Sequence, residues 1–200
     1  MLTHTLGVPH ISTGDMLRDR VRSGSTGEAV VASMQSGALV ADEVVNAMVE
    51  ERLSQADAAG GFILDGYPRT MEQAGRLGKW LVSKGICGVV IHLAVDYNVI
   101  IARLTGRRVC PRCGTLYNTA SHPPKQDGLC DLDGEKLVVR DDDREGVIRE
   151  RLDAYEKQTR PVLEYFRSGG HRVEEVDASH APPEEVFGRI CQAMGWNDRT

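Results

Sequence analysis

The chain has 200 residues, 41% of them hydrophobic, with a net charge of −5 and a sequence pI of about 5.7. This length fits one domain with a sizeable core, and no stretch approaches the roughly 18 apolar residues that would span a bilayer. The acidic balance argues against a nucleic-acid partner, because such proteins neutralise phosphates with a basic surface. No secretion signal opens the chain, so we expect a cytoplasmic protein.

Short apolar runs alternate with amphipathic segments along most of the chain. The first residues read as the last turn of a helix, because Leu2 and Leu6 are four apart and Gly7 follows. Strands are predicted at 8–11, 61–65, 88–95 and 173–176. Helices are predicted at 16–22, 28–34, 42–56, 70–83, 98–104, 144–166 and 184–194. Pro161 should end or kink the long helix near Thr159. This alternation predicts an α/β fold with a parallel sheet.

Residues 107–143 break the alternation, because they are rich in Gly, Pro, Asp and Cys and show no sustained period. Cys110 and Cys113 are separated by two residues, and Cys130 and Asp133 repeat that spacing 16 residues later. Two such pairs predict a structural zinc site with four ligands. Asp131 and Glu135 are alternatives to Asp133, and unliganded cysteines in a loop are the alternative to a metal site.

Three further motifs carry most of the functional information. The chain reads ISTGDMLR at 11–18, LDGYPRT at 64–70 with Gln73 after it, and LTGRR at 104–108. In this order, and with the cysteine pairs, they resemble adenylate kinases of the long-lid, zinc-containing bacterial type over essentially the whole chain. The DGYPR run is highly specific to nucleoside monophosphate kinases.

The resemblance implies the α/β P-loop nucleoside monophosphate kinase fold, a parallel sheet flanked by helices, in a single domain spanning 1–200. It places an inserted AMP-binding subdomain at 12–41 and a zinc-binding lid at 106–143. It implies reversible phosphoryl transfer from ATP to AMP giving two ADP, with Mg²⁺ accompanying ATP, Zn²⁺ held in the lid, and a monomeric state. The alternatives are a kinase for another nucleoside monophosphate, such as UMP or GMP, and a non-catalytic remnant that binds AMP and zinc.

The resemblance also implies roles for individual residues. The AMP-binding residues would be Thr13, Arg18, Ala38, Leu39, Val40, Gly66, Tyr67, Pro68, Arg69, Gln73, Arg140 and Arg151. The catalytic residues would be Arg69, Arg103, Arg140, Arg151 and Asp65, with Asp65 orienting Mg²⁺ through water. The ATP-binding residues would be Arg103, Arg107, Leu116, Tyr117 and His180. The metal ligands would be Cys110, Cys113, Cys130 and Asp133.

Simpler structural roles compete with several of these assignments. Ser12 with Asp15, and Thr70 with Gln73, fit the capping-box pattern of a helix start. Arg103 and Arg107 could complement the dipole of a helix end, and the acidic run 141–143 could mark a helix N-terminus. His92 is predicted to be a satisfied core histidine, whereas His10, His171 and His180 have no evident partner.

No Gly-x-x-x-x-Gly-Lys pattern, the loop that holds ATP phosphates in this family, occurs in the chain. The expected strand, loop and two helical turns amount to roughly 20 residues. We therefore expect Met1 to be an internal methionine of the first helix, with the glycine-rich loop encoded in frame upstream. The 200 residues alone should be poorly stable and nearly inactive.

Overall fold

The computed structural model describes residues 1–196, so the last four residues of the expected 1–200 domain lie outside the described residues. The helices are α1 (Leu2–Leu6), α2 (Thr13–Arg22), α3 (Glu28–Ser36), α4 (Asp42–Leu53), α5 (Met71–Lys84), α6 (Tyr97–Thr105), α7 (Glu145–Ala154), α8 (Arg160–Ser168) and α9 (Pro183–Met194). The strands are β1 (His10–Ser12), β2 (Ile63–Asp65), β3 (Val89–Ala94), β4 (Arg107–Val109), β5 (Leu116–Asn118) and β6 (Arg172–Asp177). Short turns of helix are η1 (Ala56–Ala58), η2 (Asp141–Asp143) and η3 (Tyr155–Thr159).

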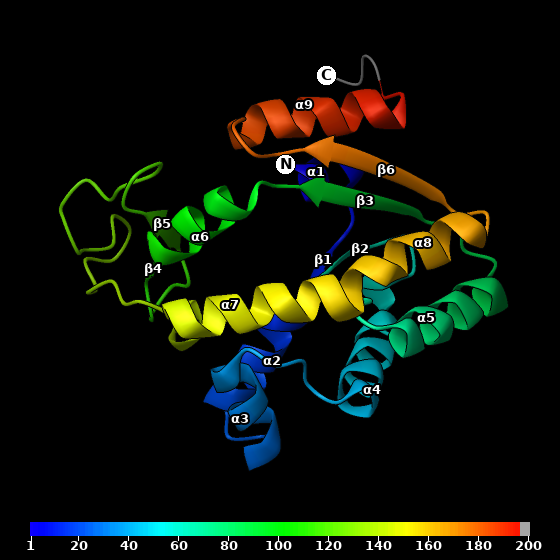
Figure 1. The fold of residues 1–200 in the computed structure, drawn as a ribbon, viewed down its shortest axis with the longest axis horizontal. Coiled ribbons are helices and arrows are strands. Elements are labelled where there is room, and N and C mark those ends of the chain that lie inside the picture. The colour runs from blue at the N-terminus through cyan, green and yellow to red at the C-terminus, as the bar shows by residue number, and fades with distance from the viewer. Residues whose placement is uncertain (197–200) are drawn as a thin grey trace.

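The strands pair in parallel, as the alternation of strands and helices predicts. β1 pairs with β2, and β3 pairs with β6 over its full length (Figure 1). Within residues 1–196 these remain two separate pairs, with no hydrogen-bonded ladder between β2 and β3. The expected single parallel sheet is therefore divided. The antiparallel hairpin β4–β5, which the sequence pattern did not predict, lies in the segment 106–143, called the cysteine segment below.

Local capping explains where several helices begin and end. α1 ends at Gly7 in a left-handed conformation (φ 66°), as the pattern of its first residues predicts. α2 begins three residues before the predicted start, because the Ser12 hydroxyl accepts the Asp15 N–H at 3.4 Å and caps the helix there. α4 ends at Leu53, earlier than predicted.

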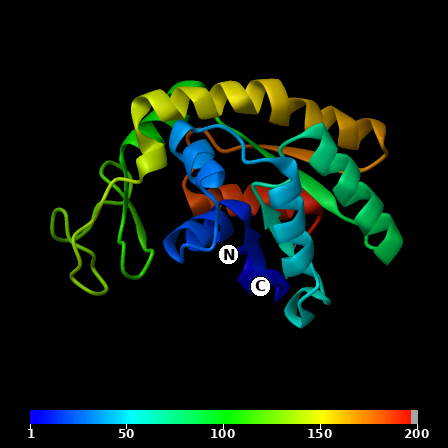
Figure 2. The ribbon, with the colours of Figure 1, turned by 90° about the horizontal axis from the view of Figure 1, so that it is seen from below.

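The predicted long helix at 144–166 is observed as α7 and α8 joined by the π-helical turn η3. Pro161 lies in the first turn of α8 directly after η3, so the residue that cannot donate an N–H falls where the regular helical pattern is interrupted. Together these helices cross the molecule as one long rod, and the cysteine segment projects from the α7 end (Figures 1 and 2). The rod therefore connects the cysteine segment to the body of the protein.

The hydrophobic core lies under this rod. Its least exposed members, Ile11, Met48, Val49 and Ala74, come from β1, α4 and α5 and are at most 1% exposed. Because β1 leads into Thr13 and α5 carries Gln73, the core fixes the positions of these motif residues. In the described part of the chain, no helix combines the length and apolar character needed to cross a bilayer.

Candidate functional site

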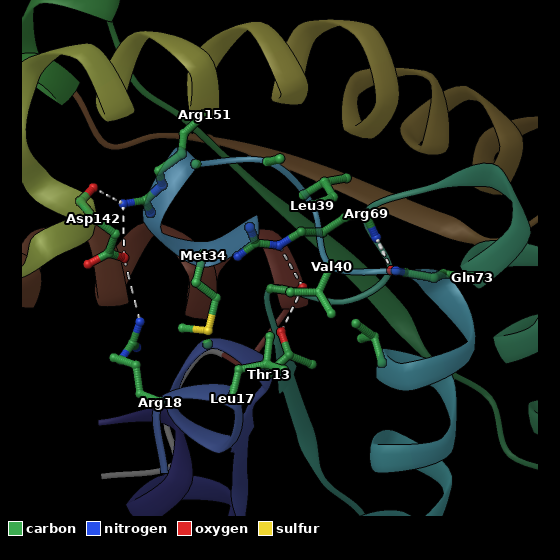
Figure 3. A pocket seen from close by; sticks show the side chains of 15 residues that line it. Thr13, Leu17, Arg18, Met34, Leu39, Val40, Arg69, Gln73, Asp142 and Arg151 are labelled. Atoms are coloured by element: carbon green, nitrogen blue, oxygen red, sulfur yellow. Dashed lines mark hydrogen bonds and ion pairs between the residues drawn. The ribbon is translucent and has the colours of Figure 1, made fainter. Parts of the chain in front are cut away.

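A cavity lies between the start of α2, the strip after α3 and the turn after β2 (Figure 3). We call it the arginine cavity. The predicted AMP-binding residues that line it are Thr13, Arg18, Ala38, Leu39, Val40, Gly66, Arg69, Gln73 and Arg151. Residues contributed by two of the sequence motifs therefore meet in one place. The side chains of Leu17, Met34 and Val45 add an apolar floor.

The turn after β2 is held by hydrogen bonds to one carbonyl oxygen. Thr13 Oγ1 and Arg69 Nε both donate to the carbonyl of Gly66, at 2.9 and 2.8 Å. Gly66 has φ 73°, and a Cβ there would lie 2.8 Å from the Arg69 guanidinium and 3.0 Å from Thr13 Oγ1. Glycine is thus required at this position for both conformation and space.

Gln73 is 2% exposed, and both ends of its amide are used within the protein. Its Oε1 accepts the backbone N–H of Arg69 at 2.8 Å, and its Nε2 donates to Asp42 at 2.6 Å. Thr70 caps α5 by accepting the Gln73 N–H, which confirms the capping interpretation of Thr70. Asp42, which the sequence analysis missed, therefore orients the amide predicted to recognise the base. Its position in the first turn of α4 gave no functional signal.

Tyr67, Pro68 and Arg140 are not among the residues that line the cavity. Tyr67 is buried in the core, and its hydroxyl donates to Asn46 Oδ1 at 2.7 Å. Burial, with a smaller effect from the charge of Glu50, raises the pKa of Tyr67 to about 12. The side chain of Tyr67 thus anchors the turn and does not face the cavity.

Positive side chains converge around the cavity. Burial, followed by the positive charges of nearby arginines, lowers the pKa of Arg69. The same causes lower the pKa of Arg140, where the repelling charges are Arg18 and Arg107. Within residues 1–196, Arg140 has no ion-pair partner within 4.0 Å. Such a concentration of guanidinium groups is suited to binding phosphate.

The acidic run 141–143 lies directly before the N-terminus of α7, as predicted, although none of its side chains caps that helix. These residues form η2, and α7 begins after Arg144 without a side-chain cap. Asp143 has a fully buried side chain that binds Arg107 through both oxygens, with one contact at 2.7 Å. Asp142 lies between Arg18 and Arg151 (Figure 3). Neither role could be predicted from the sequence, because an acidic run before a helix is explained equally well by the helix dipole.

The residues predicted for the ATP side lie apart from the cavity lining. Arg103 donates to the carbonyls of Ala178 and Ser179 at 2.8 and 3.0 Å, and Arg107 is bound to Asp143. Leu116 is 46% exposed, whereas Tyr117 is buried within the cysteine segment. Tyr117 donates to or accepts from Cys130 Sγ and accepts the Asp131 N–H, so its side chain supports that segment.

The histidines have partners that sequence spacing could not reveal. His92 lies 2.6 Å from the Tyr155 hydroxyl, which confirms that it is satisfied. His180 lies 3.3 Å from Asp96, and His10 lies 3.2 Å from Asp65. His10 and His180, for which the sequence indicated no evident partner, thus each have a carboxylate partner. Asp65 itself is exposed at the carboxyl end of β2.

The four predicted metal ligands come together in the cysteine segment. One ligand atom each of Cys110, Cys113, Cys130 and Asp133 lies within 4.8 Å of the other three. Cys113 Sγ is 3.6 Å from Cys130 Sγ, and Cys110 Sγ is 3.4 Å from the Asp133 carboxylate. Ligands about 2.0–2.3 Å from a tetrahedral zinc are roughly 3.3–3.8 Å from one another, so both distances fit the ion.

The alternative fourth ligands face elsewhere. The carboxylate of Asp131 accepts the Lys125 N–H at 2.8 Å, and that of Glu135 accepts the Lys136 N–H at 3.1 Å. Burial raises the pKa of the Cys110 thiol to about 11, because a thiolate is poorly solvated there. A cation between the four groups would offset that penalty and stabilise the thiolates.

Comparison with known proteins agrees with the motifs. The family model described as adenylate kinase matches residues 1–171. The adenylate kinase of Moorella thermoacetica is 42% identical over 97% of this chain and 89% of its own length. The adenylate kinase of Anaeromyxobacter sp. is 47% identical over 98% of this chain and 91% of its own length. The adenylate kinase of Thermotoga maritima is 42% identical over 99% of this chain and 90% of its own length. The chain belongs to the adenylate kinase family.

Proposed function

We propose that the protein is an ATP:AMP phosphotransferase whose arginine cavity binds the acceptor, AMP. The observation that carries this proposal is the convergence of Arg18, Arg69 and Arg151 on one cavity, with Arg140 beside them. Transfer between two nucleotides gathers several negative charges, and the protein must supply positive groups for them. The family membership supports the same reaction.

The apolar part of the cavity is suited to binding the adenine base of AMP. Leu39 and Val40 follow α3 and line the side opposite Arg18, so a purine ring there would remove apolar surface from water. Thr13 and Gln73 are polar residues of the same lining. The Gln73 amide is held by Asp42, so we expect recognition of adenine to depend on a small shift of this pair.

We further propose that the cysteine segment is a zinc-stabilised lid. Zinc held by Cys110, Cys113, Cys130 and Asp133 would supply the folding energy that the segment's small apolar cluster cannot. Closure would exclude water from the reacting phosphates. Adenylate kinases use Mg²⁺ with ATP; it would neutralise phosphate charge, and Asp65 is the carboxylate we expect to face it.

The donor side is where these 200 residues show the fewest groups suited to binding phosphate. They contain no Gly-x-x-x-x-Gly-Lys motif, and Arg103 and Arg107 are bound to protein acceptors. We therefore expect measurable AMP binding, weak ATP binding and slow transfer from these residues alone. A chain extended upstream by a glycine-rich loop with lysine should transfer phosphoryl much faster.

Calorimetry with AMP, GMP, UMP and ATP tests the acceptor assignment. Replacing Arg69 by Ala should weaken AMP binding about 10- to 100-fold, because a charge-assisted hydrogen bond is worth roughly 1.5–3 kcal/mol. The matched control is Arg76→Ala on α5, which removes an exposed arginine paired with Glu50. Equal AMP affinity in the Arg69→Ala and Arg76→Ala variants would refute the assignment.

The same titrations separate the alternatives. Tighter binding of GMP or UMP than of AMP would identify a kinase for another nucleoside monophosphate. AMP binding with no ADP formation, even in the extended chain, would identify a non-catalytic protein that binds AMP. Zinc content, measured on protein purified without chelator, should be about one ion per chain.

A further inference from the structure

Asp142 places a carboxylate inside the arginine cavity. It belongs to η2, at the end of the cysteine segment, and its side chain is 19% exposed. The carboxylate lies 3.4 Å from an Arg151 nitrogen and 3.8 Å from an Arg18 nitrogen (Figure 3). The same Arg151 nitrogen also contacts the Asp142 carbonyl at 3.2 Å. One acidic residue thus bridges two of the cavity's arginines.

A carboxylate and a phosphate compete for the same guanidinium donors. Both are anions whose oxygens accept hydrogen bonds from the arginine fork, and one N–H donates fully to only one of them at a time. Burial and mutual repulsion make the group of arginines costly without an anion, so Asp142 stabilises it. Any phosphate that binds Arg18 and Arg151 must replace this internal contact.

Its neighbour Asp143 has a different role. The Asp143 side chain is fully buried, binds Arg107 bidentately and does not line the cavity. The Asp142 contacts are longer than those between Asp143 and Arg107, although Asp143 also lies 3.6 Å from the Arg151 nitrogen that Asp142 contacts. Arg18 has a closer partner in Asp15 at 2.6 Å. Long, partly exposed ion pairs are weak, so Asp142 can be displaced whereas Asp143 cannot easily be.

We propose that Asp142 is an affinity-determining residue of the acceptor site, an internal anion that occupies Arg18 and Arg151 until the acceptor's phosphate displaces it. The inference rests on the proposed function, because it assigns those arginines to phosphate. Asp142 thereby weakens acceptor binding and keeps both guanidinium groups positioned in the empty site. Since Asp142 lies in the cysteine segment, its release also removes one contact between that segment and the cavity when the acceptor binds.

The test compares Asp142→Asn with wild type by calorimetry, using AMP and adenosine as ligands. Asparagine has nearly the same shape but no charge. AMP should bind about 2- to 5-fold tighter to the variant, because one weak, partly exposed ion pair would no longer compete with the phosphate. Adenosine, which lacks the phosphate, should bind both proteins equally. Inorganic phosphate, titrated and followed by ³¹P NMR, should show the same direction as AMP.

The control is Glu145→Gln, which removes one negative charge three residues away. Glu145 is 70% exposed on α7 and pairs only with Arg149 among the described residues. Its AMP affinity should equal that of wild type, which separates local competition from net charge. Asp142→Ser, checked for folding by circular dichroism, provides a second variant should Asp142→Asn fail to fold.

The outcomes distinguish the inference from the proposed function. Unchanged or weaker AMP and phosphate binding in both Asp142 variants would overturn the inference, since Asp142 would then only organise the arginines. If no variant binds AMP, the proposed function fails. In that case tighter binding of inorganic phosphate by the Asp142 variants would still support the competition, and unchanged phosphate binding would overturn it.

Discussion

The arginine cavity and the cysteine segment are stabilised by different interactions. The cavity rests on a continuous core that includes Ile11, Leu17 and Val45, so its residues are positioned by packing. The cysteine segment contains a small separate cluster of Cys110, Tyr117, Cys130 and Leu137. So few apolar side chains cannot offset the entropy of ordering nearly 40 residues. We conclude that the cavity is organised by the fold itself, and we expect the segment to depend on the proposed metal and on Asp143.

The sharpest test of this comparison is removal of a metal ligand. Mutation of a residue that only hydrogen-bonds to a metal ligand typically lowers metal affinity roughly 10- to 100-fold. Cys110→Ser removes a proposed ligand itself, so we expect a larger loss of zinc affinity. Amide exchange should then accelerate across residues 106–143 and stay unchanged in α4 and α5, as hydrogen–deuterium exchange would show. Cys87→Ser, which alters an exposed thiol outside the cluster, is the control. Full zinc content in the Cys110→Ser variant would contradict the proposed site.

The next largest effect is expected at the junction of the two regions. Asp143→Ala leaves Arg107 without its bidentate partner, and breaking a buried ion pair costs about 3–5 kcal/mol. Because Arg107 remains 21% exposed, we expect a loss of about 3 kcal/mol in the free energy of unfolding, measured with urea. Asp141→Ala removes an exposed carboxylate paired with Arg144 and should change little. Similar losses in both variants would show that burial of Asp143 is unimportant.

The sequence predicts features of these two regions where the residues involved lie close together in the chain, and fails where they lie far apart. Thr13, Gly66 and the cysteine pairs were predicted because their chemistry lies within short motifs. The bridge made by Asp142 was not, since an acidic run before a helix suggests capping equally well. The bond from Asn46 to Tyr67 joins residues 21 apart in different elements. No local spacing predicts such a contact, and the division of the parallel strands into two pairs is likewise a tertiary property.

The Asn46–Tyr67 bond tests whether packing alone organises the cavity. Tyr67→Phe leaves the Asn46 oxygen unpaired, and the Asn46 Nδ2 atom already has no partner among the described residues. A buried polar group without a partner costs about 1–3 kcal/mol, so we expect a loss of about 2 kcal/mol in unfolding free energy. The double variant Asn46→Leu with Tyr67→Phe should recover most of it. Additive losses in the double variant would show that the bond itself contributes little.

The smallest expected effect concerns Thr70, where α5 is joined to α4 beside the cavity. Its hydroxyl accepts the Gln73 N–H at 3.1 Å and donates to Asp42 at 2.7 Å. Loss of a helix cap typically costs about 1 kcal/mol, so Thr70→Ala should lower the unfolding free energy by that amount and Thr70→Ser should retain it. Because Asp42 also holds the Gln73 amide, Thr70→Ala should weaken AMP binding relative to Thr70→Ser. Equal AMP affinity in the two variants, with the stability difference present, would show that the cap supports the helix without positioning Gln73.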